Sequence, residues 1–250
     1  MNYLLTLKFD GSSFHGWQRQ QNALSVQECV ENAVESLFGS CDHITGCSRT
    51  DAGVHANCFK CNFNHKKNIP LSNVVSGLNH FLPQQIAVID AMTVPESFNA
   101  RFNCESKEYI YKIANSPVRD PFSINKAYFY KYPLDENLLS QNAADYIGTY
   151  DFSAFRAVGS DVQTTVRTIY EADVTRDGDF VTFRVRGNGF LYNMVRIMAG
   201  TLIYIAENKI PSGSIKDIIN SHDRLRAGMT LPPEGLYLNK VFYKESDLSE

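Results

Sequence analysis

A chain of 250 residues is long enough for one large domain or two small ones with a buried core. Its composition, with 44% hydrophobic and 20% charged residues, is that of a soluble globular protein and excludes a disordered or fibrous chain. The formal net charge of −3 excludes a surface coated with phosphate-binding lysines, but it is compatible with RNA recognition in a single groove.

No targeting or membrane segment is expected. Met1 leads directly into an alternating strand pattern over residues 3–9, without the basic and apolar regions of a signal peptide. The longest apolar stretch, residues 190–206, is interrupted by Asn193 and Arg196 and is too short and too polar to span a bilayer. We therefore expect a cytoplasmic protein that does not bind a membrane.

The first half of the chain predicts a mixture of strands and helices. Ser25 and Glu28 form a capping-box pattern before a run of apolar residues at helical spacing, and Gly39 ends this helix. The other elements expected in this half are a strand near 43–48, a strand near 56–63, a helix near 71–80 and a strand near 85–93.

The second half predicts a similar set of elements. Strands are expected near 109–115, 126–132, 167–175, 179–187 and 236–243, and helices near 135–147 and 190–207, with a turn at Asp177-Gly178. The similarity predicts an internal duplication with a boundary near residue 105, so that the two halves comprise residues 1–105 and 106–250. A G-x-G-x-x-G motif at a strand–helix junction and a Walker loop are both missing from the sequence, so we expect no nucleotide cofactor.

Cys58 and Cys61, flanked by His55 and His65, form a possible metal-binding pattern. In a strand, however, the alternation of side chains places the two sulfurs on opposite faces. A zinc-dependent deaminase also needs a glutamate two residues after its histidine and a proline before its cysteine pair, and neither is present. We expect no metal, and keep a small-molecule metalloenzyme only as a third hypothesis that elemental analysis for zinc would test.

The most informative stretch is residues 48–56, Ser-Arg-Thr-Asp-Ala-Gly-Val-His-Ala. Arg49 and Asp51 lie two residues apart in a short loop between strand-forming runs, and Gly53 permits a positive φ. A carboxylate and a guanidinium in such a turn form a candidate catalytic tip. By residue type alone, a solvated hairpin loop is the simpler interpretation.

This nonapeptide resembles the active-site loop of the tRNA pseudouridine synthases of the A type. Further segments resemble the same family in the same order, from the first strand almost to the carboxyl end. They are Phe9-Asp10-Gly11 with Phe14-His15-Gly16-Trp17-Gln18-Arg19-Gln20, Asn99-Ala100-Arg101-Phe102, Lys107-Glu108-Tyr109-Ile110-Tyr111, Asp151-Phe152-Ser153-Ala154-Phe155, Phe190-Leu191-Tyr192-Asn193-Met194-Val195-Arg196 and Glu234-Gly235-Leu236-Tyr237-Leu238. Ser48 departs from the pattern, because bacterial members usually have glycine before the arginine.

The resemblance implies an isomerase that converts uridine to pseudouridine in the anticodon arm of tRNA, where family members act at positions 38, 39 and 40. The reaction is redox-neutral, so no cofactor is expected. The implied fold is α+β, with two RRM-like (ferredoxin-like) halves that share an antiparallel sheet, a central catalytic cleft, and helices on one side. Family members act as homodimers, so we expect a homodimer here.

The resemblance also implies that Asp51 is the catalytic aspartate, which either attacks covalently or abstracts a proton. A carboxylate that stays ionised in a cleft needs a cation nearby. Arg196 is the candidate, because it lies in an otherwise apolar helix where an unpaired buried charge costs about 3–5 kcal/mol. Asp173 and Glu171 are the alternative partners for this arginine.

Tyr109 is implied to stack on the target uracil and to assist proton removal at carbon 5, since a phenol has both an aromatic face and a titratable oxygen. Tyr111, two residues further along the same strand face, is the local competitor for this role. Arg49 is expected to bind RNA, where a guanidinium at the loop tip fills the gap left by a flipped uridine or holds the flanking phosphate.

Trp17, Gln18 and Arg19 are expected to contact RNA through an indole face, an amide and a cation. Trp17 is equally compatible with a second interpretation, in which it anchors its loop in the core. His55 is expected to brace the catalytic loop and not to titrate in the mechanism.

Two alternatives to this function stay open. The first is a paralogue that acts on a single site or on another RNA. The second is a non-catalytic RNA-binding protein on the same scaffold. The joint presence of Arg49, Asp51, Tyr109 and Arg196 argues against the second, because binding alone does not require a buried carboxylate–arginine pair.

Overall fold

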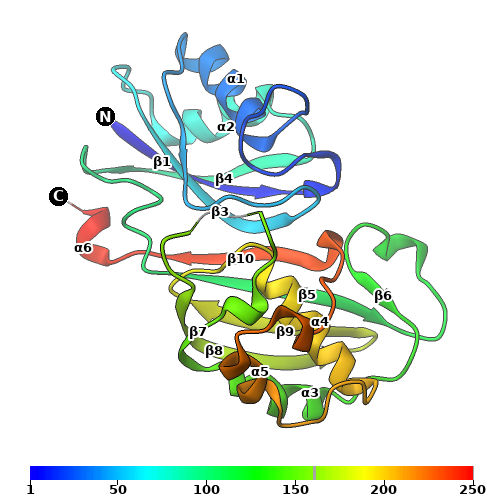
Figure 1. Ribbon diagram of the computed structural model, residues 1–250. Helices are drawn as coiled ribbons and strands as arrows, with labels where there is room; N and C mark the ends of the chain where they lie inside the picture. Colours follow the sequence, from blue (N-terminus) through cyan, green and yellow to red (C-terminus); the bar gives the residue numbers. More distant parts are fainter. Residues whose placement is uncertain (160–161, 250) are drawn as a thin grey trace. The chain divides into compact units, whose positions relative to one another are not determined.

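The computed structural model describes residues 1–159 and 162–249 (Figure 1). The chain divides into two compact units: unit 1 consists of Met1–Glu105 and Tyr237–Glu250, and unit 2 of Ser106–Leu236. Both units are mixed α+β, and most of their strand pairs are antiparallel. None of the helices within the described residues is long and apolar enough to cross a membrane.

Unit 1 has a sheet with the strand order β4-β1-β3-β10, and its helices α1 and α2 pack against each other. Strands β1 and β4 and strands β1 and β3 pair antiparallel, whereas β10 runs parallel to β3. The elements are β1 (Asn2–Phe9), η1 (Gly11–Ser13), α1 (Val26–Phe38), β2 (Thr45–Gly46), β3 (His55–Asn64), α2 (Leu71–Phe81), β4 (Ile86–Val94), β10 (Leu236–Phe242) and α6 (Glu245–Leu248).

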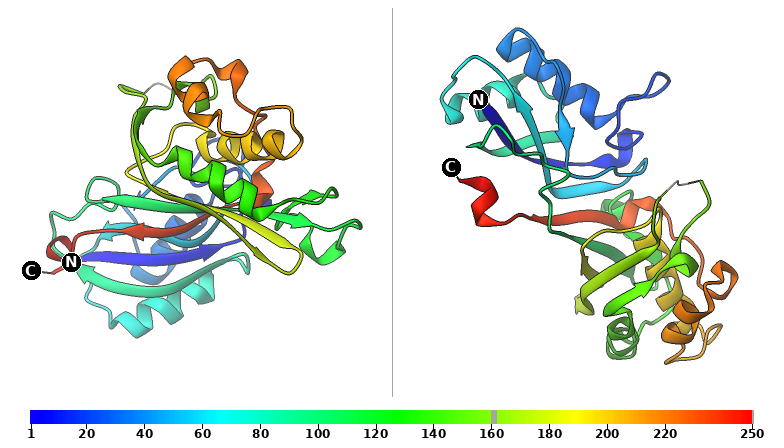
Figure 2. Two further views of the ribbon diagram at one scale, coloured as in Figure 1. Left: turned by 90° about the horizontal axis from the view of Figure 1, so that it is seen from below. Right: turned by 60° about the vertical axis from the view of Figure 1, so that its left-hand side comes forward.

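The strands of unit 2 follow the order β5-β9-β8-β7, all antiparallel, and the short β6 pairs parallel with β5. Helices α3 and α4 contact each other on one side of these strands (Figure 2). The elements are β5 (Ser106–Asn115), η2 (Pro121–Ser123), β6 (Tyr128–Tyr130), α3 (Glu136–Ala143), η3 (Ala144–Tyr146), β7 (Gly148–Asp151), η4 (Ser153–Phe155), β8 (Val166–Asp177), β9 (Phe180–Gly187), α4 (Met194–Ala206), α5 (Ile215–Ser221), η5 (Arg224–Arg226) and η6 (Pro233–Gly235).

Helix α1 confirms the prediction made from its end signals. The Ser25 hydroxyl accepts a hydrogen bond from the backbone N–H of Glu28 at 3.2 Å, which satisfies one of the donors left open at a helix start. Gly39 ends the helix in the left-handed region with φ 90°. The buried aromatic rings of Tyr3, Phe38 and Phe63 then join this helix to the sheet, with Tyr3 centroids 5.3 Å and 5.4 Å from the other two.

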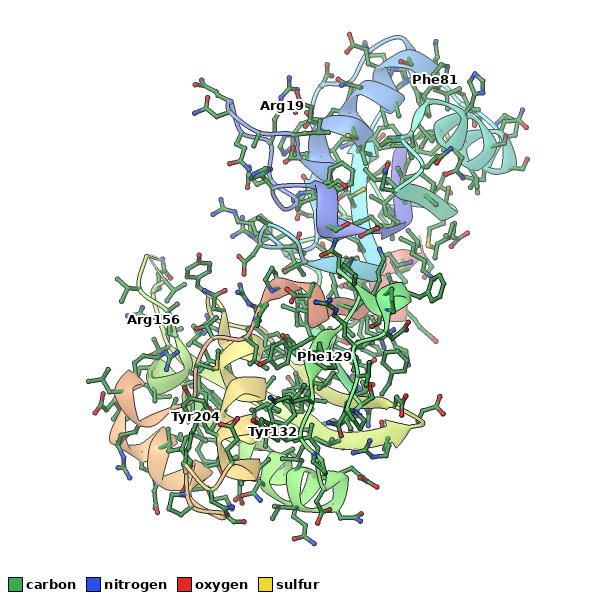
Figure 3. The ribbon with its side chains drawn as sticks, turned by 90° about the vertical axis from the view of Figure 1, so that its right-hand side faces the viewer. Arg19, Phe81, Phe129, Tyr132, Arg156 and Tyr204 are labelled. Carbon is green, nitrogen blue, oxygen red and sulfur yellow. The ribbon has the colours of Figure 1, made fainter. Side chains whose placement is uncertain are left out.

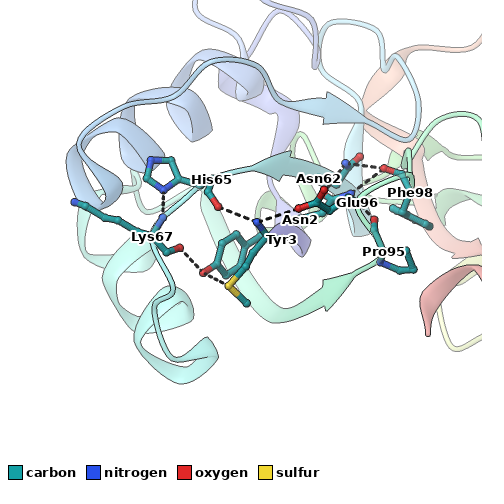
Figure 4. A network of polar contacts seen from close by, with 9 residues as sticks. Asn2, Tyr3, Asn62, His65, Lys67, Pro95, Glu96 and Phe98 are labelled. Carbon is teal, nitrogen blue, oxygen red and sulfur yellow. Dashed lines mark hydrogen bonds and ion pairs between the residues drawn. The ribbon is translucent and has the colours of Figure 1, made fainter. Parts of the chain in front are cut away.

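Two asparagines on neighbouring strands of unit 1 build a buried polar network (Figure 4). The Asn2 amide donates to the carbonyls of Pro95 and Phe98 at 3.0 and 2.9 Å. The Asn62 amide donates to Asn2 at 2.9 Å, and its oxygen accepts from the N–H of Ala100 at 2.8 Å. Because these buried groups are paired, the network fixes the loop that follows β4 without an unsatisfied polar atom.

Some predicted elements differ from the observed ones at their ends. Helix α4 begins at Met194 and not near residue 190, because Asn193 adopts a left-handed backbone with φ 59°. The predicted strand near 43–48 is only Thr45–Gly46, and the one near 126–132 is only Tyr128–Tyr130. The sequence did not predict β7 (Gly148–Asp151) or α5 (Ile215–Ser221).

Candidate active site

The loop that carries Asp51 lies between β2 and β3 in unit 1 and is closed by main-chain contacts. The Val54 N–H donates to the Asp51 carbonyl at 3.2 Å, and Gly53 turns the chain with φ 80°. The Gly53 N–H donates to the carbonyl of Phe14 at 3.2 Å, which ties the loop to the amino-terminal segment. Arg49 is exposed and Asp51 is half-buried, so the loop has a cation at its tip and a carboxylate nearer its base.

The segment of residues 10–20 packs directly on this loop. The Trp17 N–H donates to the Thr50 carbonyl at 3.3 Å. Gly16 has φ 81°, and a Cβ at this position would collide with the same carbonyl oxygen. The two segments that resemble one family at separate places in the sequence therefore form a single structural feature in unit 1.

Trp17 lies in the core of unit 1, where only 3% of it is exposed. Its indole stacks on Phe59, with ring centroids 4.1 Å apart and an interplanar angle of 28°. The structure therefore favours the interpretation of Trp17 as a loop anchor over its interpretation as a stacking surface for RNA. Gln18 and Arg19 are exposed (Arg19 is labelled in Figure 3). Arg19 pairs with Glu31 of α1 at 2.9 Å.

His55, at the end of the loop that carries Asp51, contacts the amino-terminal segment and β10. It is 1% exposed, and its Nδ1 accepts a hydrogen bond from the N–H of Gly11 at 3.0 Å. Asp10 Oδ1 lies 3.2 Å from the same nitrogen, and the ring stacks on Tyr237 with centroids 4.5 Å apart. These contacts join the start of β3 to residues 10–11, which follow β1, and to β10.

Tyr109 and Tyr111 are on the same face of β5 in unit 2 but have different surroundings. Tyr111 is fully buried, its hydroxyl donates to the Pro232 carbonyl at 2.7 Å, and burial raises its pKa far above the ordinary value. Tyr109 is 7% exposed and contacts the edge of Phe190, with centroids 5.1 Å apart. The Tyr111 phenol is therefore committed to a structural hydrogen bond.

Arg196 lies in the first turn of α4, and the groups that it contacts include two uncharged acceptors. Its Nε donates to the Leu231 carbonyl at 2.6 Å, and its Nη1 donates to Asn193 Oδ1 at 2.7 Å. Neither acceptor was identified from the sequence. An asparagine three residues before an arginine at a helix start is the only local signal of this arrangement.

The two carboxylates considered as alternative partners of Arg196 are bound by other arginines. Arg184 pairs with Glu171 at 2.7 Å and with Asp173 at 2.6 Å. Arg186 also pairs with Glu171, at 3.1 Å. The structure thus gives both carboxylates a different role, in an ion-pair network across β8 and β9.

The cysteine–histidine pattern around β3 is not assembled into a metal site. Cys61 is buried and Cys58 is half-exposed, as expected from their alternation along the strand. His65 contacts Ser40 and the N–H of Lys67, at 3.2 and 3.0 Å. Within residues 1–159 and 162–249, no group of three or more His, Cys, Asp or Glu side chains is arranged to hold a metal ion.

Comparison with known proteins identifies a family for this chain. The family model described as tRNA pseudouridine synthase matches residues 6–103 and 143–244. A protein named tRNA pseudouridine synthase A from Thermoanaerobacter sp. is 41% identical over 242 residues, covering 97% of this chain and 99% of the relative. Its namesake from Clostridium acetobutylicum is 42% identical with the same coverage. A solved Cbf5-Nop10-Gar1 complex is similar at 11% identity and a TM-score of 0.46, over 98% of this chain and 50% of that one.

Proposed function

This chain belongs to the tRNA pseudouridine synthase family, and from that premise we propose that it isomerises uridine to pseudouridine in the anticodon arm of tRNA, at positions 38, 39 and 40. The observation that carries the proposal is the loop of residues 48–56, which matches the family's active-site loop and is held in a fixed turn around Asp51. The substrate in this proposal is tRNA, and the reaction needs no metal and no cofactor.

Asp51 is the nucleophile or base of the proposed reaction. Isomerisation breaks the N-glycosidic bond, turns the uracil and rejoins it through carbon 5, so it requires a group that attacks the sugar or ring, or removes a proton. A half-buried carboxylate on a rigid loop meets this requirement, because its position is set by the main-chain bonds of Val54 and Gly53. Covalent attack and proton abstraction both remain compatible with this arrangement.

Arg196 is the cation that keeps the Asp51 carboxylate ionised in this proposal, and Tyr109 stacks on the uracil and assists proton removal at carbon 5. The Leu231 carbonyl and the Asn193 side chain are uncharged, so the hydrogen bonds to them orient the guanidinium without neutralising it. A folded Arg196→Met enzyme is expected to lose most of its turnover. Full activity in that variant would contradict the role of Arg196.

RNA binding in this proposal uses exposed side chains of unit 1. Arg49 fills the space of the flipped uridine or holds the flanking phosphate, and Gln18 and Arg19 contact the RNA backbone. Trp17 supports these contacts from beneath, through its packing on Phe59. Because the net charge is −3, such contacts must be confined to one groove.

At the level of the whole protein we propose two RRM-like halves, residues 1–105 and 106–250, that share an antiparallel sheet with a catalytic cleft, and a homodimer that acts in the cytoplasm. Strand β10, near the end of the second half in sequence, pairs parallel with β3 of the first. Light scattering on the purified protein tests the dimer, because the expected mass is twice 28.2 kDa. A monomer at micromolar concentration in the presence of tRNA would contradict it.

The release of tritium from tRNA labelled at carbon 5 of uridine tests the reaction, because isomerisation replaces the hydrogen at that carbon. Wild type and Asp42→Asn, a change at an exposed carboxylate of the same unit, are expected to release tritium, whereas Asp51→Asn is not. Tight tRNA binding without release by wild type would indicate the non-catalytic RNA-binding protein. Absence of both would indicate another RNA as substrate.

A further inference from the structure

Asn193 immediately precedes α4 and has an unusual backbone for a helix start. Its φ of 59° and ψ of 8° lie in the left-handed region, which asparagine tolerates better than most residues other than glycine. An asparagine at this position normally accepts a hydrogen bond from an N–H of the first helical turn. The Asn193 side chain makes no such bond. Its oxygen instead accepts from Nη1 of Arg196 at 2.7 Å.

A second acceptor holds the same guanidinium from the segment of residues 227–232. The Leu231 carbonyl accepts from Nε of Arg196 at 2.6 Å, and the Leu231 N–H donates back to the Arg196 carbonyl at 3.3 Å. The segment is fixed to α4 one turn further on, where the Gly228 N–H donates to the Thr201 hydroxyl at 2.8 Å. The Leu231 carbonyl therefore belongs to a rigid part of unit 2.

Bonds to Nε and Nη1 together define the plane of the guanidinium, because the group is planar and its five N–H donors have a fixed geometry. The Asn193 and Leu231 oxygens are uncharged, so the bonds to them set the direction of the guanidinium without neutralising it. Preorganised charges of this kind lower the cost of stabilising an anion, because they need not reorient during the reaction.

We propose that Asn193 is a positioning residue of the active site, which acts with the Leu231 carbonyl to fix the plane of the Arg196 guanidinium. The inference rests on the proposed function, in which Arg196 is the catalytic cation. The positioning role explains why the Asn193 side chain does not cap the helix and why its backbone adopts a conformation that few residues tolerate.

Asn193→Gly is the sharpest test, because glycine accepts the left-handed backbone more readily and removes only the side-chain acceptor. The melting temperature of this variant is expected to equal or exceed that of wild type. Its single-turnover rate of pseudouridine formation is expected to fall roughly 10-fold to 100-fold, the range for a displaced catalytic group. The Kd for tRNA is expected to change less than about twofold, since positioning serves the chemical step and not binding.

Asn208→Gly is the matched control at the other end of α4. Asn208 is exposed, also has a left-handed backbone (φ 57°), and the same substitution there is expected to leave the rate unchanged. Asn193→Asp is a second variant, which keeps an acceptor oxygen but adds a charge that competes for Arg196. Its rate is expected to fall as well, with tRNA binding retained.

The outcomes distinguish a failure of the positioning role of Asn193 from a failure of the proposed function. A wild-type rate in Asn193→Gly or in Asn193→Asp would overturn the positioning role while the proposed function stands. Equal losses of rate and tRNA affinity in Asn193→Gly would also overturn it, because they indicate a general structural defect. No product from wild type and Asn208→Gly would overturn the proposed function itself, together with the role assigned to Asn193.

Discussion

At the scale of single residues, Tyr109 and Tyr111 are expected to have different roles: Tyr109 in the reaction and Tyr111 in the stability of the fold. Tyr109 packs on Phe190 through its ring, so Tyr109→Phe keeps the aromatic contact and loses only the phenol oxygen. We predict a folded variant with wild-type tRNA affinity and a turnover lowered roughly 100-fold or more, the usual effect of losing a general acid or base. Full turnover would remove Tyr109 from proton transfer and leave it only a stacking role. Single-turnover assays with tRNA measure the rate of pseudouridine formation by Tyr109→Phe and by wild type.

Tyr111→Phe is predicted to have the opposite effect. The substitution removes the hydrogen bond to the Pro232 carbonyl and leaves that acceptor without its donor. The free energy of unfolding is expected to fall by about 1–2 kcal/mol, while the turnover of the folded fraction is retained. Urea unfolding of the two phenylalanine variants compares them directly. A greater loss of turnover in Tyr111→Phe than in Tyr109→Phe would reverse the two assignments.

The ion-pair network of β8 and β9 predicts a pH dependence of stability. A hydrogen bond from Arg184, reinforced by Arg186, holds the pKa of Glu171 below its ordinary value of 4.5. A depressed carboxyl pKa stabilises the folded state above the ordinary pKa, and this contribution is lost as the pH falls below about 4.5. Melting temperatures of wild type and Glu171→Gln should therefore differ at pH 7 and converge towards pH 3. A constant difference over this range would contradict the prediction.

At the scale of elements, two helical glycines allow a matched comparison of packing. A Cβ on Gly200 of α4 would collide with the Met229 carbonyl, which belongs to the backbone and cannot move aside. The atom nearest to a Cβ on Gly77 of α2 would be Cδ1 at the flexible end of the Leu37 side chain, at 2.8 Å. We predict that Gly200→Ala lowers the free energy of unfolding by about 1–3 kcal/mol. Gly77→Ala should be neutral or stabilising by up to about 1 kcal/mol. Equal effects of the two substitutions on the free energy of unfolding would show that the backbone of residues 227–232 moves to make room for the added methyl group.

The same elements show what local sequence can and cannot predict. The bounds of α1 follow from Ser25 and Gly39, because both act within one turn of the helix. The start of α4 does not follow from apolar periodicity, because the left-handed Asn193 is stabilised by a side chain three residues further on. The short β6 pairs with β5 across an intervening loop, and such non-local pairing is not encoded in the alternation of a three-residue strand.

The candidate site likewise has features that local sequence predicts and features that it does not. The sequence identifies the loop around Asp51 and the single arginine of an apolar helix, because each is an exception to its local pattern. The burial of Trp17 depends on Phe59, more than forty residues away, and could not be predicted from the loop alone. The same holds for the Leu231 carbonyl, since a backbone acceptor carries no signature in its side chain.

At the scale of the whole molecule, the chain does not simply fold from one end to the other. Residues Tyr237–Glu250 belong to unit 1, where β10 pairs parallel with β3, although they follow unit 2 in the sequence. The proposed catalytic residues are likewise distributed, with Asp51 in unit 1 and Tyr109 and Arg196 in unit 2. Neither unit alone therefore holds the complete set of residues that the proposed function uses.

The most direct test of the proposed function is chemical mapping of pseudouridine on unmodified tRNA transcripts with uridine at positions 38, 39 and 40. Wild-type protein is predicted to form pseudouridine at these positions and nowhere else in the transcript, and Asp51→Asn is predicted to form none. Pseudouridine formation by Asp51→Asn at the wild-type rate would contradict the role of the loop. Modification confined to sites outside the anticodon arm would contradict the proposed substrate position.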